Sequence, residues 1–204
     1  MKYTTLKVIR TKDLPDKAFE LILERRDIQY IPGDCLLIKG LNNEFRPYFV
    51  ASGMQEPWFR IIIEKNLNDS LINYLYNIKK GSRIKVKREP FSIFPNLINQ
   101  KQKTIFIASG IGIAPFLSYF STYPLQKITK VIYHVQEEGI NVAWLKTRQD
   151  IIINTNPNIL INEIPLNKKC RYYLCGSGKI VTQFKTAISG KVKDSKVFTC
   201  SILT

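Results

Sequence analysis

The stretch Ser109-Gly-Ile-Gly-Ile-Ala-Pro-Phe116 joins a short apolar run, residues 104–108, to a segment of helical character, residues 114–122. A buried strand, a glycine-containing turn and a helix in this order are typical of the βα unit of a parallel sheet. Glycine permits close backbone approach and positive φ angles, and Pro115 suits the first turn of a helix. The full G-x-G-x-x-G fingerprint is not met, because Pro115 stands at its third glycine position.

A second turn of the same kind, Cys175-Gly-Ser-Gly178, follows the strand-like run 171–174 and precedes a helical stretch, 179–189. If the sheet takes the doubly wound strand order 3-2-1-4-5, the strands before the two turns are neighbours. Both turns then lie at the crevice where ligands bind in open α/β sheets. Each turn alone is equally compatible with a tight strand-to-helix connection, but together they predict a site for a dinucleotide pyrophosphate.

The remaining expected elements are strands at 131–135, 158–162 and 196–200 and helices around 114–122 and 142–152.

The first half of the chain predicts a small antiparallel β-barrel. It carries short runs rich in Ile, Val, Leu, Phe and Tyr, separated by turn signals such as Pro32-Gly33-Asp34. One helix is expected at Ser70–Lys79, capped by Asp69 or Ser70. The barrel is expected to span residues 1–98 and a Rossmann-like α/β parallel-sheet domain residues 99–204. The expected strands are YTTLKVIR (3–10), FELILER (19–25), DCLLIKG (34–40), RPYFVAS (46–52), WFRIIIEK (58–65) and SRIKVKRE (82–89).

Composition excludes several classes of function. The four cysteines form no Cys-x-x-Cys pair, so iron-sulfur clusters and structural zinc have no visible ligand set, and no metal site is expected. A single histidine, His134, leaves little room for hydrolytic triads, and we expect it to be a polar strand-end residue. The chain shows no apolar run long enough to span a membrane and no signal-peptide pattern, so we expect a cytoplasmic protein.

The chain is strongly basic, with 31 Lys and Arg against 16 Asp and Glu and a formal charge of +15. Such a charge attracts acidic partners, nucleic acid or anionic membrane, but coding bias towards lysine produces it equally well. A nucleic-acid binder ranks last, because the chain has no RNA- or DNA-reading motif.

With these motifs in view, the chain resembles the ferredoxin-NADP reductase superfamily, whose members pair a flavin-binding barrel with a nicotinamide-nucleotide-binding α/β domain. The resemblance rests on RPYFVAS (46–52), ASGIGIAPF (108–116) and YYLCGSGKIV (172–181), in that order. It implies an oxidoreductase with FAD and NADH or NADPH as cofactors. Hydride would pass from NAD(P)H to FAD, and electrons on to an acceptor such as ferredoxin or flavodoxin, acidic carriers that a basic surface attracts. A free flavin or a quinone is an alternative acceptor to such a carrier protein.

The resemblance also implies roles for particular residues. Arg46 would pair with the flavin phosphate and Tyr48 would lie against the isoalloxazine, while Cys175 would lie near the nicotinamide. Tyr48 and Cys175 are thus the expected catalytic residues. The expected cofactor-binding residues are Arg46, Pro47, Tyr48, Phe49, Val50, Ala51, Ser52, Leu71, Ile72, Asn73, Gly110, Ile111, Gly112, Cys175, Gly176 and Ser177.

Several positions depart from the family pattern. Phe49 replaces a Ser or Thr whose hydroxyl contacts flavin N5, and Asp69 and Ile72 replace the Gly and the Ser or Thr of the second flavin-phosphate motif. A carboxylate near a pyrophosphate would repel it by about 1 kcal/mol or more. Thr199-Cys200-Ser201 replaces the C-terminal Glu and aromatic. These departures keep open an alternative, a flavin- or nucleotide-binding regulatory subunit with reduced catalysis.

The choice between NADH and NADPH stays open. Glu137 and Glu138 follow the second strand of the sheet and favour an unphosphorylated ribose, as an acidic residue does in many dinucleotide folds. Lys146 and Arg148 would favour the 2′-phosphate instead.

Overall fold

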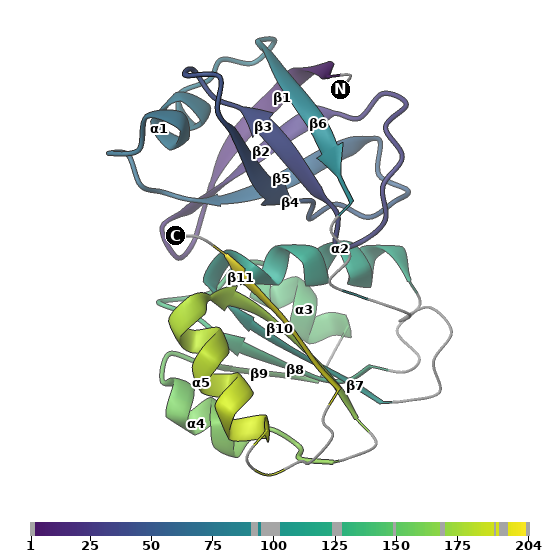
Figure 1. Ribbon diagram of the computed structural model, residues 1–204, viewed down its shortest axis with the longest axis vertical. Helices are drawn as coiled ribbons and strands as arrows, with labels where there is room; N and C mark the ends of the chain where they lie inside the picture. Colours follow the sequence, from purple (N-terminus) through teal and green to yellow (C-terminus); the bar gives the residue numbers. More distant parts are fainter. Residues whose placement is uncertain are drawn as a thin grey trace. The chain divides into compact units, whose positions relative to one another are not determined.

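The computed structural model describes residues 3–90, 94, 103–123, 128–148, 150–167, 170–189, 191 and 196–202. The chain forms two compact units (Figure 1). The barrel unit comprises Met1–Ser92 and Ala114–Tyr123, and the parallel-sheet unit comprises Ile93–Ile113 and Pro124–Thr204. The predicted boundary between residues 98 and 99 lies outside the described residues.

The barrel unit is an antiparallel sheet of six strands in the order β4-β3-β6-β1-β2-β5. A bridge between Val50, directly after β4, and Ile61 of β5 links the two edge strands, so the sheet closes on itself as the sequence predicts. The strands are β1 (Thr4–Leu14), β2 (Ala18–Glu24), β3 (Cys35–Lys39), β4 (Phe45–Phe49), β5 (Trp58–Glu64) and β6 (Arg83–Glu89).

The core of the barrel unit is built from alternate residues of its strands, such as Leu6 and Val8 of β1 and Leu21 and Leu23 of β2. Helix α1 (Ser70–Tyr76) adds Leu71 and Leu75 to this core. The helix is shorter than predicted, because the chain leaves the helical conformation at Asn77. Ile78 is still buried, and this continued burial explains why the apolar pattern runs past the end of the helix.

The barrel unit includes one helix from the second half of the chain, α2 (Ala114–Thr122). Its Ser118 hydroxyl donates to the Ser52 carbonyl over 2.6 Å, and its Thr122 hydroxyl accepts from the Met54 N–H over 3.0 Å. Gly53 lies so close to the helix that a Cβ there would meet the Ser121 Cβ at 2.8 Å. The Gln55 amide also donates to the Thr122 carbonyl over 3.4 Å, so the segment after β4 is tied to α2 by three hydrogen bonds and one close approach.

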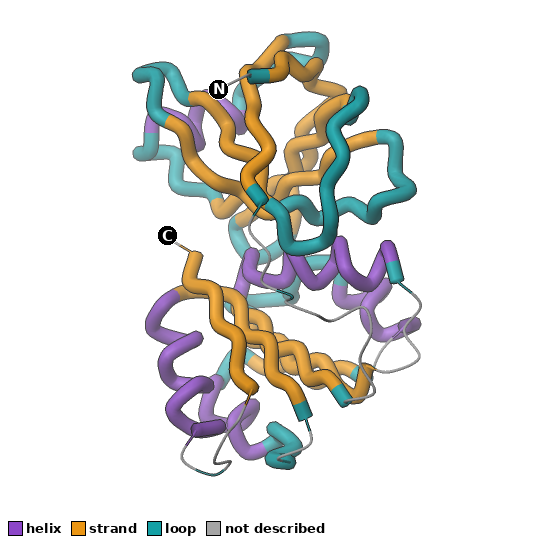
Figure 2. The backbone as a smooth tube through the Cα atoms, turned by 45° about the vertical axis from the view of Figure 1, so that its right-hand side comes forward, coloured by secondary structure: helices purple, strands orange, loops and turns teal. Residues whose placement is uncertain are grey.

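The parallel-sheet unit has five parallel strands in the order β11-β10-β7-β8-β9, which is the predicted doubly wound order 3-2-1-4-5 (Figure 1). Figure 2 shows strands of this sheet side by side, with helices next to them. Leu160 of α4 and Phe184 of α5 share one apolar cluster with Ile105, Ile107 and Ile132 of the sheet. The elements are β7 (Thr104–Ser109), a 3-10 turn η1 (Gly110–Ile113), β8 (Ile128–His134), α3 (Val142–Arg148), β9 (Ile151–Asn154), α4 (Pro157–Asn162), β10 (Arg171–Ser177), α5 (Gly178–Ser189) and β11 (Lys196–Ile202).

Two sequence predictions in this unit are wrong. Residues 158–162, expected as the third strand, belong to α4, and the third strand is β9, whose first residues were expected to end a helix. Asn156 caps α4, since its side chain accepts the Asn158 N–H over 2.9 Å, and Pro157 occupies the first turn. Periodicity alone does not distinguish a short apolar strand from a short buried helix.

Candidate functional site

The two glycine turns of the parallel-sheet unit lie in direct backbone contact. A Cβ at Gly112 would stand 2.2 Å from the Cys175 carbonyl oxygen, and a Cβ at Gly176 would stand 2.6 Å from the Ser109 Cβ. Real Cβ atoms do not approach other atoms so closely, so each position accepts only glycine without movement of the opposing strand. The structure thus brings together the turn after β7 and the turn at the end of β10, as the strand order predicts.

Two side chains of β8 hold the first turn, and the first of them is Tyr133. Its hydroxyl donates to the Gly110 carbonyl and accepts from the Ile140 N–H, each over 3.1 Å. Gly110 itself has a φ of 53°, in the left-handed region that favours glycine. Sequence reasoning missed Tyr133, for which the available signal is a tyrosine near the end of a strand that precedes a polar turn.

His134 ties the same turn from its other side. Its Nε2 lies 3.1 Å from the Thr155 carbonyl and its Nδ1 lies 3.1 Å from the Ser109 hydroxyl. Because a carbonyl only accepts, Nε2 carries the hydrogen, and Nδ1 of the neutral ring then accepts from Ser109. His134 is therefore a polar residue at the end of β8, as expected, and its hydrogen bonds also orient the turn, which the sequence did not predict.

Cys175 is buried, with 1% of its surface exposed, and it lies opposite Cys200 in the register of β10 and β11. A hydrogen bond from Cys175 lowers the pKa of the Cys200 thiol, against the opposing effect of burial. The Cys175 thiol therefore interacts with Cys200 on the neighbouring strand. Its role beside a nicotinamide stays a prediction.

In the barrel unit, Arg46 is paired with two carboxylates of the chain itself. Its guanidinium donates to Asp69 and, over 3.0 Å, to Glu44. The hydrogen bond with Asp69 is the main cause that raises the pKa of Arg46, and the negative charges of Asp69 and Glu44 add to it. Arg46 and Tyr48 lie two residues apart on β4 and so share one face of the strand.

The carboxylate of Asp69 also takes the N–H groups at the start of α1. It accepts from the Ile72 N–H over 3.0 Å and from the Leu71 N–H, and these bonds together with Arg46 lower its pKa. The Asn73 N–H donates to the Asp69 carbonyl over 2.9 Å. All three N–H groups predicted to face a flavin pyrophosphate are thus engaged by a single residue.

Tyr48 is half-buried against the barrel core, and burial is the main cause that raises its pKa to about 12. Its phenol is therefore neutral at physiological pH. Phe49 is buried on the opposite face of β4, and Pro47 is exposed.

The backbone after β4, predicted to meet the flavin ring edge, makes several hydrogen bonds within the barrel unit. The Val50 N–H donates to the backbone carbonyl of Asp34 over 3.2 Å, and the Ala51 N–H donates to the backbone carbonyl of Arg60 over 2.8 Å. The Ser52 carbonyl accepts from the Tyr30 hydroxyl over 2.9 Å as well as from α2. These bonds fix the position of the segment.

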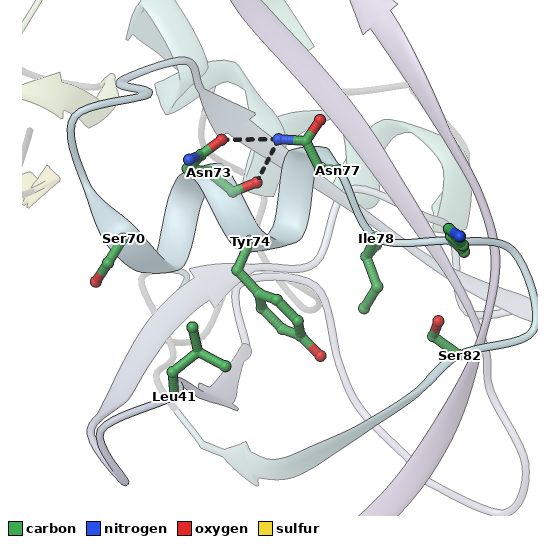
Figure 3. A pocket seen from close by; sticks show the side chains of 8 residues that line it. Leu41, Ser70, Asn73, Tyr74, Asn77, Ile78 and Ser82 are labelled. Atoms are coloured by element: carbon green, nitrogen blue, oxygen red, sulfur yellow. Dashed lines mark hydrogen bonds between the residues drawn. The ribbon is translucent and has the colours of Figure 1, made fainter.

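A pocket of about 580 Å³ lies along α1 (Figure 3). Ser70, which follows Asp69 in the sequence, is one of its lining residues. Figure 3 shows Tyr74 and Leu41 on its wall, with the amide of Asn77 bonded to Asn73. Of its eight lining residues, only Lys79 carries a charge.

Comparison with known proteins finds one distant relative by sequence. No protein-family model matches the chain. A flavodoxin/ferredoxin-NADP reductase of Buchnera aphidicola subsp. Schizaphis graminum is 25% identical over 141 residues, which make up 68% of this chain and 55% of that relative. The match therefore spans about half the length of the relative.

Solved structures agree more completely in fold. A ferredoxin NADP+ reductase from Neisseria gonorrhoeae, with bound FAD and NADP, superimposes with a TM-score of 0.80 at 15% identity, covering 98% of this chain and 99% of that one. The ferredoxin-NADP+ reductase of Plasmodium falciparum gives 0.78 at 17% identity, covering 98% and 96%. The chain has the two-domain fold of the ferredoxin-NADP reductase family.

Membrane spans and metal clusters are both missing from the part of the chain that the structure describes. No helix within the described ranges is long and apolar enough to cross a membrane. Among the same residues, no group of three or more His, Cys, Asp or Glu is placed to hold a metal ion.

Proposed function

We propose that the chain is a flavin-dependent oxidoreductase that oxidises NAD(P)H and passes the electrons to an acceptor such as ferredoxin or flavodoxin. The observation that carries the proposal is the contact between the two glycine turns at the carboxyl ends of β7 and β10, in a chain with this fold. That edge of an open α/β sheet is where nucleotides bind. When bound, a flavin supplies the redox chemistry by accepting a hydride and releasing electrons singly or in pairs.

The residues of the chain bind and orient the ligands. Gly110, Ile111 and Gly112 of the first turn, with Gly176 and Ser177 of the second, would offer backbone groups to the dinucleotide, and the space beside the Gly110 Cα is open. Tyr48 would cover one face of the flavin ring, and its high pKa keeps it uncharged there. The ring end of a flavin therefore fits the barrel unit, whereas the phosphate end meets Arg46 already paired with Asp69.

The choice of nucleotide and acceptor rests on charge. Glu137 and Glu138 are exposed after β8, at the same edge of the sheet as the two turns, and they favour NADH. Lys146, exposed on α3, favours NADPH instead. The formal charge of +15 favours an acidic carrier protein as acceptor.

A second candidate is a regulatory subunit that binds flavin or nucleotide without turnover. The Arg46–Asp69 pair favours it, because this pair occupies groups that a tightly held flavin would use.

Anaerobic reductive titration of the FAD-reconstituted protein distinguishes the two candidates. We expect NADH or NADPH, added separately, to bleach the visible flavin absorbance with a stoichiometry near one. Lys185→Gln, an exposed change in the middle of α5, is the matched control and should behave as the wild type does. Uptake of FAD without bleaching by either nucleotide would establish the regulatory candidate. A protein that neither takes up FAD nor oxidises either nucleotide would exclude the enzyme.

A further inference from the structure

The phosphate end of the proposed flavin site is already filled by a carboxylate. Asp69 accepts hydrogen bonds from the Arg46 guanidinium and from the Leu71 and Ile72 N–H groups. A guanidinium and adjacent backbone N–H groups are the donors that proteins use to hold phosphate. Asp69 therefore takes the donors that a flavin phosphate would need.

The charges around Arg46 oppose a second anion. Arg46 carries one positive charge, and its partners Asp69 and Glu44 carry two negative ones, so the cluster is net negative within a chain that is strongly basic. A phosphate that approaches Arg46 must either displace Asp69 from its hydrogen bonds or remain beside two carboxylates. Both routes weaken its binding, and the riboflavin part of the ligand is unaffected.

The side chains of Arg46, Asp69 and Glu44 are all partly exposed to solvent. The exposed fractions are 34% for Arg46, 22% for Asp69 and 40% for Glu44. Water screens the interaction in part, so the penalty on a phosphate is moderate and depends on salt.

We infer that Asp69 is a specificity-determining residue that removes most of the affinity a flavin gains from its phosphates. The ligand class is then the flavin ring with its ribityl chain, held by Tyr48 and its neighbours on β4. Riboflavin, FMN and FAD bind with comparable affinity, and the flavin exchanges with solution. This inference rests on the proposed function, because it concerns the same site.

The test measures dissociation constants of riboflavin, FMN and FAD by the change in flavin fluorescence for wild type and Asp69→Asn. Asparagine caps a helix as well as aspartate does, so this variant keeps the fold of α1 while it loses the charge. The matched control is Asp13→Asn, which removes one carboxylate from a different ion pair, with Lys65. Thermal unfolding of each variant verifies that it folds.

For the wild type, we expect the three dissociation constants to agree within about threefold, since a net negative cluster cancels the attraction between Arg46 and phosphate. Asp69→Asn is expected to lower the dissociation constants of FAD and FMN about tenfold and to leave that of riboflavin unchanged. The gain should shrink in high salt, and Asp13→Asn should change none of the constants.

Two results would overturn the inference while leaving the proposed function intact. One is wild-type protein that binds FAD about a hundredfold or more tighter than riboflavin. The other is Asp69→Asn that binds all three flavins as the wild type does. If none of the three flavins bound to either protein, both the inference and the proposed function would be wrong.

Discussion

A methyl group at Gly112 tests whether the contact between the two turns is as tight as the structure shows. In Gly112→Ala the new Cβ would stand 2.2 Å from the Cys175 carbonyl oxygen and 2.6 Å from the Gly176 nitrogen, whereas ordinary contacts begin at 3.4 Å. These are backbone atoms of β10, which rotation of a side chain does not move. We expect a loss of unfolding free energy of about 3 kcal/mol, at the upper end of the usual cost of overpacking.

Gly110→Ala is the matched control, two residues away in the same turn. A Cβ there meets nothing within 4 Å, and the cost comes only from a φ of 53°. A non-glycine residue in the left-handed region costs about 1 kcal/mol. The two variants should therefore differ by about 2 kcal/mol, although both replace a glycine by alanine in one turn.

The assay is urea unfolding followed by the fluorescence of Trp144 on α3. The chain has two tryptophans, and the exposed Trp58 lies in the barrel unit, so a Trp58→Phe background makes the signal report the parallel-sheet unit. Equal midpoints for Gly112→Ala and Gly110→Ala, at equal slopes, would refute the close approach of the two turns.

Three further predictions concern the barrel unit. The Asp34 carboxylate is 1% exposed and is bonded to Arg88 over 2.8 Å. Arg88→Ala leaves this carboxylate without its counter-ion and should lower the free energy of unfolding in urea by about 3 kcal/mol. A loss no larger than that of an exposed substitution would contradict this. Tyr30→Phe should lower the free energy of unfolding by about 1 kcal/mol, because it removes the hydroxyl that lies 2.9 Å from the Ser52 carbonyl and 2.6 Å from the Gly53 carbonyl; an unchanged midpoint would show that these contacts contribute nothing. The pKa of Tyr48 is raised from 10.0 to about 12, so its neutral form contributes stability that is fully present below pH 10 and lost as the pH rises towards 12. Wild type should therefore lose more stability than Tyr48→Phe across that range, and parallel pH profiles would argue against burial of the phenol.

The barrel strands were predictable because short runs rich in Ile, Val, Leu, Phe and Tyr are separated by turn signals such as Pro32-Gly33-Asp34. The order of the parallel strands followed from a common topology, and it correctly placed Gly112 beside Cys175. The error at residues 158–162 arose where Asn156 and Pro157 start a helix within an isoleucine-rich run, and tertiary pairing decided which run became β9.

The Arg46–Asp69 pair was beyond sequence reasoning for a different reason. The sequence identified Asp69 as a departure from the family pattern, but its partner lies 23 residues earlier, and the fold of the barrel brings the two together. The same holds for Tyr133, whose hydrogen bonds with Gly110 and Ile140 depend on the neighbouring positions of β7 and β8.

Hydrogen-deuterium exchange with and without nucleotide tests the central claim most directly, because the claim is that the two glycine turns form one dinucleotide site. With saturating NADH or NADPH, we expect joint protection of the amides of residues 110–113 and 175–178, with the barrel residues 18–24 unchanged as an internal reference. Protection of one turn without the other, or of neither, would contradict the account.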